Sequence, residues 1–127
     1  MVNFGLASID DITKISKKVG DDNSFTPDSL FMCGKQEDDI LMWFAFRIED
    51  GLVEIVDIDA EGKDENLLFF CGRSGLNALD LTGYRNIISK NEKIKEILDK
   101  LGFKKEGEVF YLAITDDYFK AGCCKNT

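Results

Sequence analysis

A nine-residue run, ILMWFAFRI at positions 40–48, limits the possible folds of this chain more than any other feature. All of its residues except Arg47 are apolar, and turn-forming segments bound it on both sides. A strand with one solvent-facing side would alternate apolar and polar residues, so the run predicts a central strand buried on both faces. We therefore expect a sheet with helices packed on both of its faces.

The neighbouring segments complete an antiparallel meander. SLFMCGK (29–35) precedes the run and LVEIVDID (52–59) follows it, each across a short turn. Strict alternation along 52–59 predicts one face made of Leu52, Glu54, Val56 and Ile58, and a second face made of Val53, Ile55, Asp57 and Asp59. The Glu54 carboxylate is therefore expected among apolar neighbours.

The first residues and the segment before the meander predict a strand, a helix and a loop. MVNFGLAS has the pattern of a short strand, and SIDDITKISKKVG that of an amphipathic helix with Ser8 or Asp10 as its N-cap. Residues 20–28 hold the only proline and predict a loop, with a short helical turn after Pro27.

Two more helices and two more strands are expected after the meander. Residues 64–81 predict a helix that Gly83 ends and that Gly72 and Gly75 weaken in its middle. YRNIIS predicts a strand, EKIKEILDKLG a helix capped by Asn91 and ended by Gly102, and EVFYLAI a final strand. Residues 115–127 are expected to form a tail.

Composition sets the size and setting of the protein. A chain of 127 residues with 44% hydrophobic content can bury one ordinary core, so a single domain over 1–127 is expected. No signal peptide is evident and no stretch approaches the roughly 20 apolar residues of a membrane span, which favours a cytoplasmic protein. Thiols rather than disulfides are then expected at Cys33, Cys71, Cys123 and Cys124.

Charge excludes several classes of partner and of chemistry. A net charge of −8 argues against nucleic acid and anionic membranes, and it favours a cationic amine substrate or a partner that binds an acidic surface. The chain has no histidine, which removes the usual general base and zinc ligand. The cysteines lack metal-ligand spacing, so buried structural thiols at Cys33 and Cys71 are favoured over a metal site.

The element order and the segment from Asn91 to Phe103 together resemble the GNAT superfamily of N-acetyltransferases. The positions that carry the resemblance are Asn91, Ile94, Ile97, Lys100, Gly102 and Phe103. It implies an α+β (α/β/α) fold with a mixed, mostly antiparallel central sheet and helices on both faces. It also implies that acetyl-CoA lies in a cleft where the strands at 52–59 and 84–89 separate. The cofactor-binding residues would be Ile58, Asp59, Ala60 and Asn91.

The sequence departs from the family pattern in two places. The segment AEGKDENLL is shorter than the family's pyrophosphate-binding loop and has one glycine, Gly62, while Asp64 and Glu65 would repel a pyrophosphate in the first turn of the next helix. Lys63 is the local cation. The family tyrosine that often protonates the leaving thiolate falls at Leu98.

Each candidate site residue has a structural interpretation beside the functional one. Glu54 is the candidate catalytic residue, a general base for an ammonium substrate, but a glutamate in a strand also commonly faces solvent. Asn91 is a cofactor ligand or simply a helix cap. Tyr111 is a substitute acid or a packing residue.

Two hypotheses for the function follow. The first is an acetyltransferase that moves an acetyl group from acetyl-CoA to an amine. The second is a GNAT-like binding or regulatory module that has lost catalysis. Fold resemblance alone does not decide between them.

Overall fold

The computed structural model describes residues 2–19 and 28–119. The loop at 20–27 lies outside these ranges, and so do Cys123 and Cys124 in the tail. The helical turn expected after Pro27 falls at the limit of the described residues. Within them the chain forms one seven-stranded sheet in the order β1-β2-β3-β4-β5-β7-β6. All neighbouring strands are antiparallel except β4 and β5, which are parallel.

The elements follow the expected order with one addition. The strands are β1 (Asn3–Leu6), β2 (Leu30–Gln36), β3 (Asp39–Glu49), β4 (Leu52–Ala60), β5 (Asn86–Ser89), β6 (Lys104–Glu106) and β7 (Val109–Ala113). The helices are α1 (Ile9–Val19), α2 (Glu65–Leu81) and α3 (Lys95–Lys100), with short 3-10 turns η1 (Glu61–Lys63) and η2 (Glu92–Ile94). The predicted mixed α+β fold class is confirmed.

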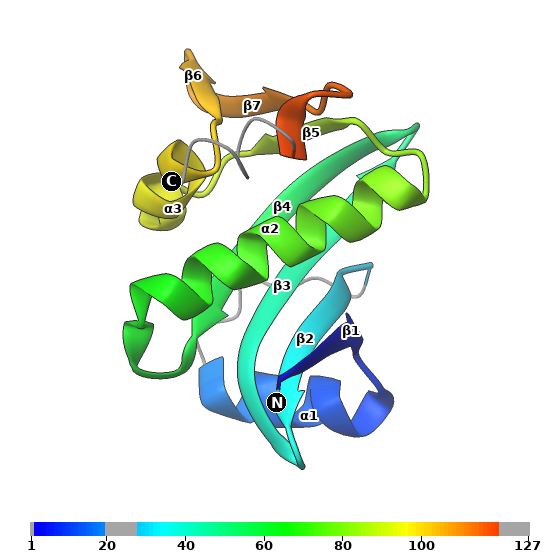
Figure 1. The fold of residues 1–127 in the computed structure, drawn as a ribbon, viewed down its shortest axis with the longest axis vertical. Coiled ribbons are helices and arrows are strands. Elements are labelled where there is room, and N and C mark those ends of the chain that lie inside the picture. Colours follow the sequence, from blue (N-terminus) through cyan, green and yellow to red (C-terminus); the bar gives the residue numbers. More distant parts are fainter. Residues whose placement is uncertain (1, 20–27, 120–127) are drawn as a thin grey trace.

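Helices cover both faces of the sheet, as the apolar run predicted. Phe44 and Phe46 of β3 pack into the larger core with α2 and α3, whereas Trp43 and Ala45 pack into a second core with Ile15 of α1. Figure 1 shows α2 lying across β3 and β4, with α3 beside it and α1 near β1 and β2. None of the helices in the described ranges is long and apolar enough to span a membrane.

Reciprocal hydrogen bonds begin α1. The Ser8 hydroxyl accepts from the Asp11 amide at 3.1 Å, and the Asp11 carboxylate accepts from the Ser8 amide at 2.9 Å. This is a capping box, in which each side chain satisfies a backbone donor that the first turn leaves unpaired. Of the two caps considered from the sequence, Ser8 is the one that the structure uses.

The alternation predicted for β4 is wrong beyond Val56. Ala45 pairs with Asp57 while Phe46 pairs with Ile55, so Val56 is an extra residue in a β-bulge. The bulge moves Ile58 to the α2 face, where it joins the core with Val53 and Ile55. It also turns Asp57 toward α1, where its carboxylate meets the Trp43 indole.

The last helix is followed by a hairpin rather than a single strand. β6, at 104–106, pairs with β7 across a turn that contains Gly107 at a φ of 65°. The sequence prediction missed β6 because all three of its residues are charged and exposed, so it has no apolar alternation.

Gly72 and Gly75 have a packing role that the sequence did not reveal. A Cβ on Gly75 would lie 2.4 Å from the Phe44 ring, and a Cβ on Gly72 would lie 2.5 Å from Leu101. Both contacts are far shorter than van der Waals distance, so the glycines let α2 approach β3 and the end of α3 closely. The two glycines lower the helix propensity of α2, but they allow it to pack this closely.

We predict that Gly75→Ala destabilises the protein despite the better helix propensity of alanine. Overpacking against Phe44 should cost about 1–3 kcal/mol, which exceeds the gain of up to about 1 kcal/mol from replacing a helical glycine. Urea denaturation measures the free energy of unfolding. Asn77→Ala, on the exposed side of α2, is the control and should be neutral or slightly stabilising. An equal gain for both variants would contradict the packing role.

Candidate functional site

The two parallel strands in the middle of the sheet separate partway along their length. β4 and β5 pair only from Val53 opposite Ile87 to Ile55 opposite Ser89. β4 continues to Ala60, whereas the chain leaves β5 after Ser89 and turns into η2. The space between the unpaired part of β4 and the segment 91–97, here called the wedge, is where the resemblance implied a cleft. The strands are adjacent and parallel, as that expectation required.

Side chains from the β5 end bind the carbonyls of β4 at the apex of the wedge. The Ser89 hydroxyl donates to the Ile55 carbonyl at 2.9 Å, and the Asn91 amide nitrogen Nδ2 donates to the Val56 carbonyl at 2.8 Å. Asn91 Oδ1 also accepts from the Lys93 amide at 2.9 Å, so the predicted helix cap is confirmed. Asn91 thus begins η2 and fixes it to the bulged residue of β4.

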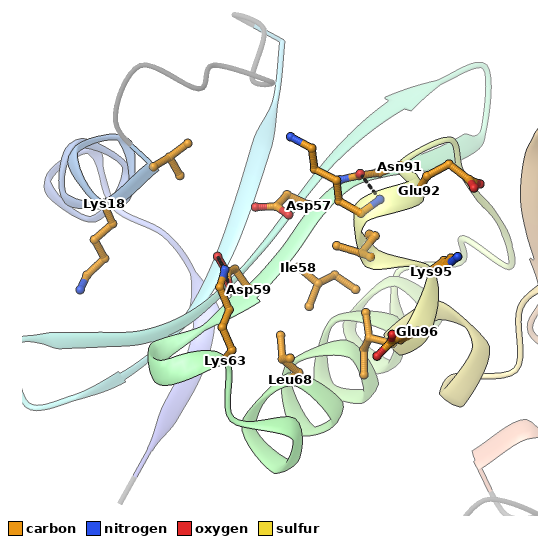
Figure 2. Close-up of a pocket in the computed structure, with 14 residues that line it drawn as sticks. Lys18, Asp57, Ile58, Asp59, Lys63, Leu68, Asn91, Glu92, Lys95 and Glu96 are labelled. Carbon is orange, nitrogen blue, oxygen red and sulfur yellow. Dashed lines mark hydrogen bonds and ion pairs between the residues drawn. The ribbon is translucent and has the colours of Figure 1, made fainter.

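The wedge encloses a cavity of about 540 Å³. Figure 2 shows Asp57, Ile58 and Asp59 of β4 at its centre, Lys18 of α1 on one side, and Asn91 and Glu92 on the other. Of the four residues predicted to bind the cofactor, Ile58, Asp59 and Asn91 line this cavity. The Ala60 side chain is buried in the core beneath α2, so only its backbone could contact a ligand at the edge of β4.

Asp57 is a cavity residue that the sequence analysis did not nominate. Its carboxylate is half-buried and accepts a hydrogen bond from Trp43 Nε1 at 3.1 Å. Burial raises the pKa of Asp57, the Trp43 hydrogen bond lowers it, and nearby Asp59 raises it further, with a net shift upward. A carboxyl group with a raised pKa in a cavity is a candidate for proton transfer. The wrong alternation had placed it on the other face.

Glu54 lies in a different pocket, of about 240 Å³, next to Ile88 and Lys90. Its carboxylate forms an ion pair with Arg47 across the β3–β4 pair at 3.2 Å. None of the residues that line this pocket also lines the wedge cavity. The structure therefore separates the sequence-nominated base from Asn91 and the other predicted ligands.

The start of α2 is occupied by the chain's own acidic residues. Asp64 Oδ1 accepts from the amides of Asn66 at 2.8 Å and Leu67 at 3.1 Å. Lys63 lies 2.7 Å from Asp59, and Glu65 lies 3.4 Å from Lys100. An anion bound here would compete with Asp64 for the same backbone donors.

The other nominated side chains have structural partners. Tyr111 donates its hydroxyl to Asn86 Oδ1 at 2.7 Å, and Leu98 is fully buried in the core. Cys33 and Cys71 are buried free thiols, and burial raises the pKa of Cys33 to about 11 and that of Cys71 further. Within the described residues no group of three or more Cys, Asp or Glu side chains is arranged to hold a metal ion.

Comparison with known proteins shows the fold. No family model and no curated protein matches the chain. A protein from Desulfovibrio desulfuricans assigned to the GNAT acetyltransferases superposes with a TM-score of 0.74 at 13% identity, over 91% of this chain and all of that one. The ribosomal-protein-S18-alanine N-acetyltransferase of Escherichia coli gives a TM-score of 0.71 at 10% identity, over 91% and 95% of the two chains.

A further solved structure contains CoA. The GNAT-family N-acetyltransferase YhbS of Escherichia coli, in complex with CoA, gives a TM-score of 0.70 at 14% identity over 92% of this chain and 83% of that one. The chain therefore has the fold of the GNAT acetyltransferases. Its structural relatives are acetyltransferases, and some of them have been solved with CoA. At these identities the similarity defines the fold alone.

We predict that Asn91→Ser destabilises the protein by about 1 kcal/mol, because serine keeps the helix cap but leaves the buried Val56 carbonyl without its side-chain donor. Asn91→Ala removes both interactions and should cost about 2–3 kcal/mol. Urea denaturation of both variants separates the two contributions. A serine variant as stable as the wild type would show that the bond across the wedge does not stabilise the fold.

Proposed function

We propose that the chain binds acetyl-CoA in the wedge and transfers its acetyl group to an amine. The observation that carries this proposal is the 540 Å³ cavity where β4 and β5 separate, at the place where the GNAT resemblance puts the pantetheine arm. The backbone of Ile58, Asp59 and Ala60 would contact that arm along the unpaired edge of β4. Asn91 would act by holding the apex open at a fixed width.

The reaction needs a group that accepts a proton from the amine. The amine nitrogen attacks the thioester carbonyl carbon, a C–N bond forms, the C–S bond breaks, and the thiolate of CoA leaves. Asp57 lies in the cavity and is the carboxylate that we place in this role. Asp57 then passes the proton that it took from the amine to the CoA thiolate through water. A backbone amide near Ile58 would polarise the thioester carbonyl.

We propose a different role for Glu54, in binding the amine substrate. Its carboxylate, held by Arg47 at 3.2 Å, lines a pocket beside the paired ends of β4 and β5. A carboxylate there would attract a cationic amine toward the sheet, in keeping with the net charge of −8. On this proposal Glu54 contributes to binding of the amine and Asp57 to proton transfer.

One observation favours a second function, that of a binding or regulatory module without transferase activity. The amides at the start of α2, which would hold the CoA pyrophosphate, already donate to Asp64. Lys63 is paired with Asp59 at 2.7 Å. We infer that this loop is a degenerate form of the family's pyrophosphate-binding loop. CoA would then bind weakly or not at all.

We predict that CoA at millimolar concentration raises the melting temperature of the protein. Ligand at 100 times its Kd stabilises the native state by about 2.7 kcal/mol, a shift of several degrees for a domain of this size. Differential scanning fluorimetry measures it, with adenosine as a control that lacks the pantetheine arm and the phosphates. No shift at saturation would reject the acetyltransferase and favour the module.

A matched variant tests the loop in the same assay. Asn caps helices as well as Asp does, so Asp64→Asn keeps the cap while removing the charge, and we expect CoA to bind about 2–5 times more tightly. Glu65→Gln removes a neighbouring charge that makes no cap. Unchanged affinity in Asp64→Asn would place the pyrophosphate elsewhere.

We predict that Asp57→Asn lowers the rate of acetyl transfer by about 100-fold or more while leaving the affinity for CoA unchanged, as expected for loss of a general base. Glu54→Gln should instead raise KM for the amine. Steady-state kinetics with a panel of primary amines measures both effects. The assignment of roles would be reversed if Glu54→Gln lost kcat and Asp57→Asn did not.

The same variant carries a stability signature with a defined sign. Because the pKa of Asp57 is raised on folding above its ordinary value of 3.8, ionisation opposes folding. This cost is absent below pH 3.8 and is fully present once the pH exceeds the folded-state pKa. The stability of Asp57→Asn relative to wild type should therefore rise as the pH increases from 3 to 7 in urea denaturation. If the difference in stability between Asp57→Asn and wild type did not vary with pH, burial would not raise the pKa of Asp57.

A further inference from the structure

The bulge in β4 places two carboxylates on one face of the sheet. Val53 and Ile55 point into the core under α2, so Glu54 between them points to the opposite face, on which α1 lies. In a regular strand Asp57 would point to the α2 face, but the extra residue at Val56 turns it to the α1 face. Glu54 and Asp57 therefore share a face, Glu54 in its own pocket and Asp57 in the wedge cavity (Figure 2).

The register with β3 gives the spacing of these two residues along the strand. Glu54 pairs with Arg47 and Asp57 pairs with Ala45, and these partners are two residues apart on β3. An antiparallel strand rises about 3.4 Å per residue, so Glu54 and Asp57 are offset by roughly 7 Å. A substrate that contacts both carboxylates needs two polar groups joined by a chain of about four carbons.

The pocket at Glu54, of about 240 Å³, is lined by charges of both signs. Arg47 lies 3.2 Å from Glu54 in an ion pair whose side chains are 29% and 25% exposed. Lys90 adds a second cation, and Asp28 and Glu49 add two carboxylates. A simple cation bound at Glu54 would lie against the positive charge of Arg47, and a simple anion would lie against three carboxylates. A group that carries an ammonium and a carboxylate on one carbon has a partner for each charge.

We propose that the amine substrate is a basic amino acid of the lysine or ornithine type, with its head group at the Arg47–Glu54 pair and its terminal amine at Asp57. This inference rests on the acetyl transfer proposed above and names the substrate class for it. The α-ammonium group binds Glu54 and the α-carboxylate binds Arg47. The four-carbon stem of lysine, or the shorter stem of ornithine, then runs along the α1 face of β4 and spans the offset to Asp57.

This orientation determines which nitrogen is acetylated. The terminal amine, in its neutral form, attacks the thioester carbonyl carbon of acetyl-CoA, a C–N bond forms and the C–S bond breaks. Asp57 takes the proton from that nitrogen and the CoA thiolate receives one through water, so the products are the side-chain N-acetylated amino acid and CoA thiol. The α-amine stays unmodified because Glu54 holds it roughly 7 Å from Asp57.

Binding to the free protein tests the head-group site without requiring catalysis. The matched ligands are L-lysine, cadaverine, which lacks the carboxylate, 6-aminohexanoate, which lacks the α-ammonium group, and pentylamine, which lacks both. NMR titrations, followed through the amide signals of Ile88 and Lys90, measure each Kd. L-lysine should bind about 10-fold more tightly than cadaverine or 6-aminohexanoate, because each analogue lacks one charge-assisted hydrogen bond. An affinity for either analogue equal to that for L-lysine overturns the proposal.

Substitutions locate the head group in this pocket. Arg47→Gln should remove most of the advantage of L-lysine over cadaverine, and Glu54→Gln most of its advantage over 6-aminohexanoate. Arg85→Gln is the matched control, since Arg85 also forms ion pairs, with Asp80 and Asp116, but lines neither this pocket nor the wedge cavity. It should keep the wild-type order of affinities. The same order in Arg47→Gln and Glu54→Gln as in wild type overturns the proposal.

The acetylated product separates this inference from the proposed function. With acetyl-CoA and L-lysine, mass spectrometry should find Nε-acetyllysine and not Nα-acetyllysine. The expected order of affinities without any acetylated product would support the head-group site and reject acetyl transfer. Acetylation of pentylamine as fast as L-lysine, or acetylation of lysine at its α-amine, would support the transferase and overturn the substrate class proposed here.

Discussion

The hydrogen bond from Asn91 Nδ2 to the Val56 carbonyl, 2.8 Å long, is the interaction on which the central feature of this fold depends. Val56 is the extra residue of the β4 bulge, so the geometry of β4 changes where β5 leaves it. Without a strand beside it, this buried carbonyl needs another donor, and the side chain after β5 supplies one. The bulge and the cap together allow the sheet to open while the Val56 carbonyl keeps a hydrogen-bond donor.

The bulge also decides which side chains enter the cavity. By rotating the chain at Val56 it places Ile58 in the core under α2 and turns Asp57 toward Trp43 and α1. Burial disfavours the ionised form of the Asp57 carboxylate and so raises its pKa. Ionisation of this group therefore costs stability. A core built for stability alone would have an uncharged residue here. The proton-transfer role that we propose for Asp57 would account for a carboxylate that costs stability at this position.

The sequence predicts most of the fold because its signals are local. The apolar run at 40–48, the cap at Asn91 and the glycines at 83 and 102 each act through periodicity or backbone conformation, and each is found where expected. The bulge at Val56 is not local, since IVDID alternates equally well in either register and only pairing with β3 fixes it. For this reason Asn91 and Ile58 could be nominated from the sequence and Asp57 could not.

The two functions that we propose differ in what they require of the α2 N-terminus. Helix-start amides attract any nearby anion, and a tethered carboxylate has a far higher effective concentration than a free phosphate. Asp64 is bound to two such amides at 2.8 and 3.1 Å. A ligand therefore has to gain more from the wedge than it loses by displacing Asp64 or by leaving its phosphates in solvent. If the wedge holds the pantetheine arm, as we propose, the affinity of an acyl-CoA would depend mainly on that arm rather than on its nucleotide.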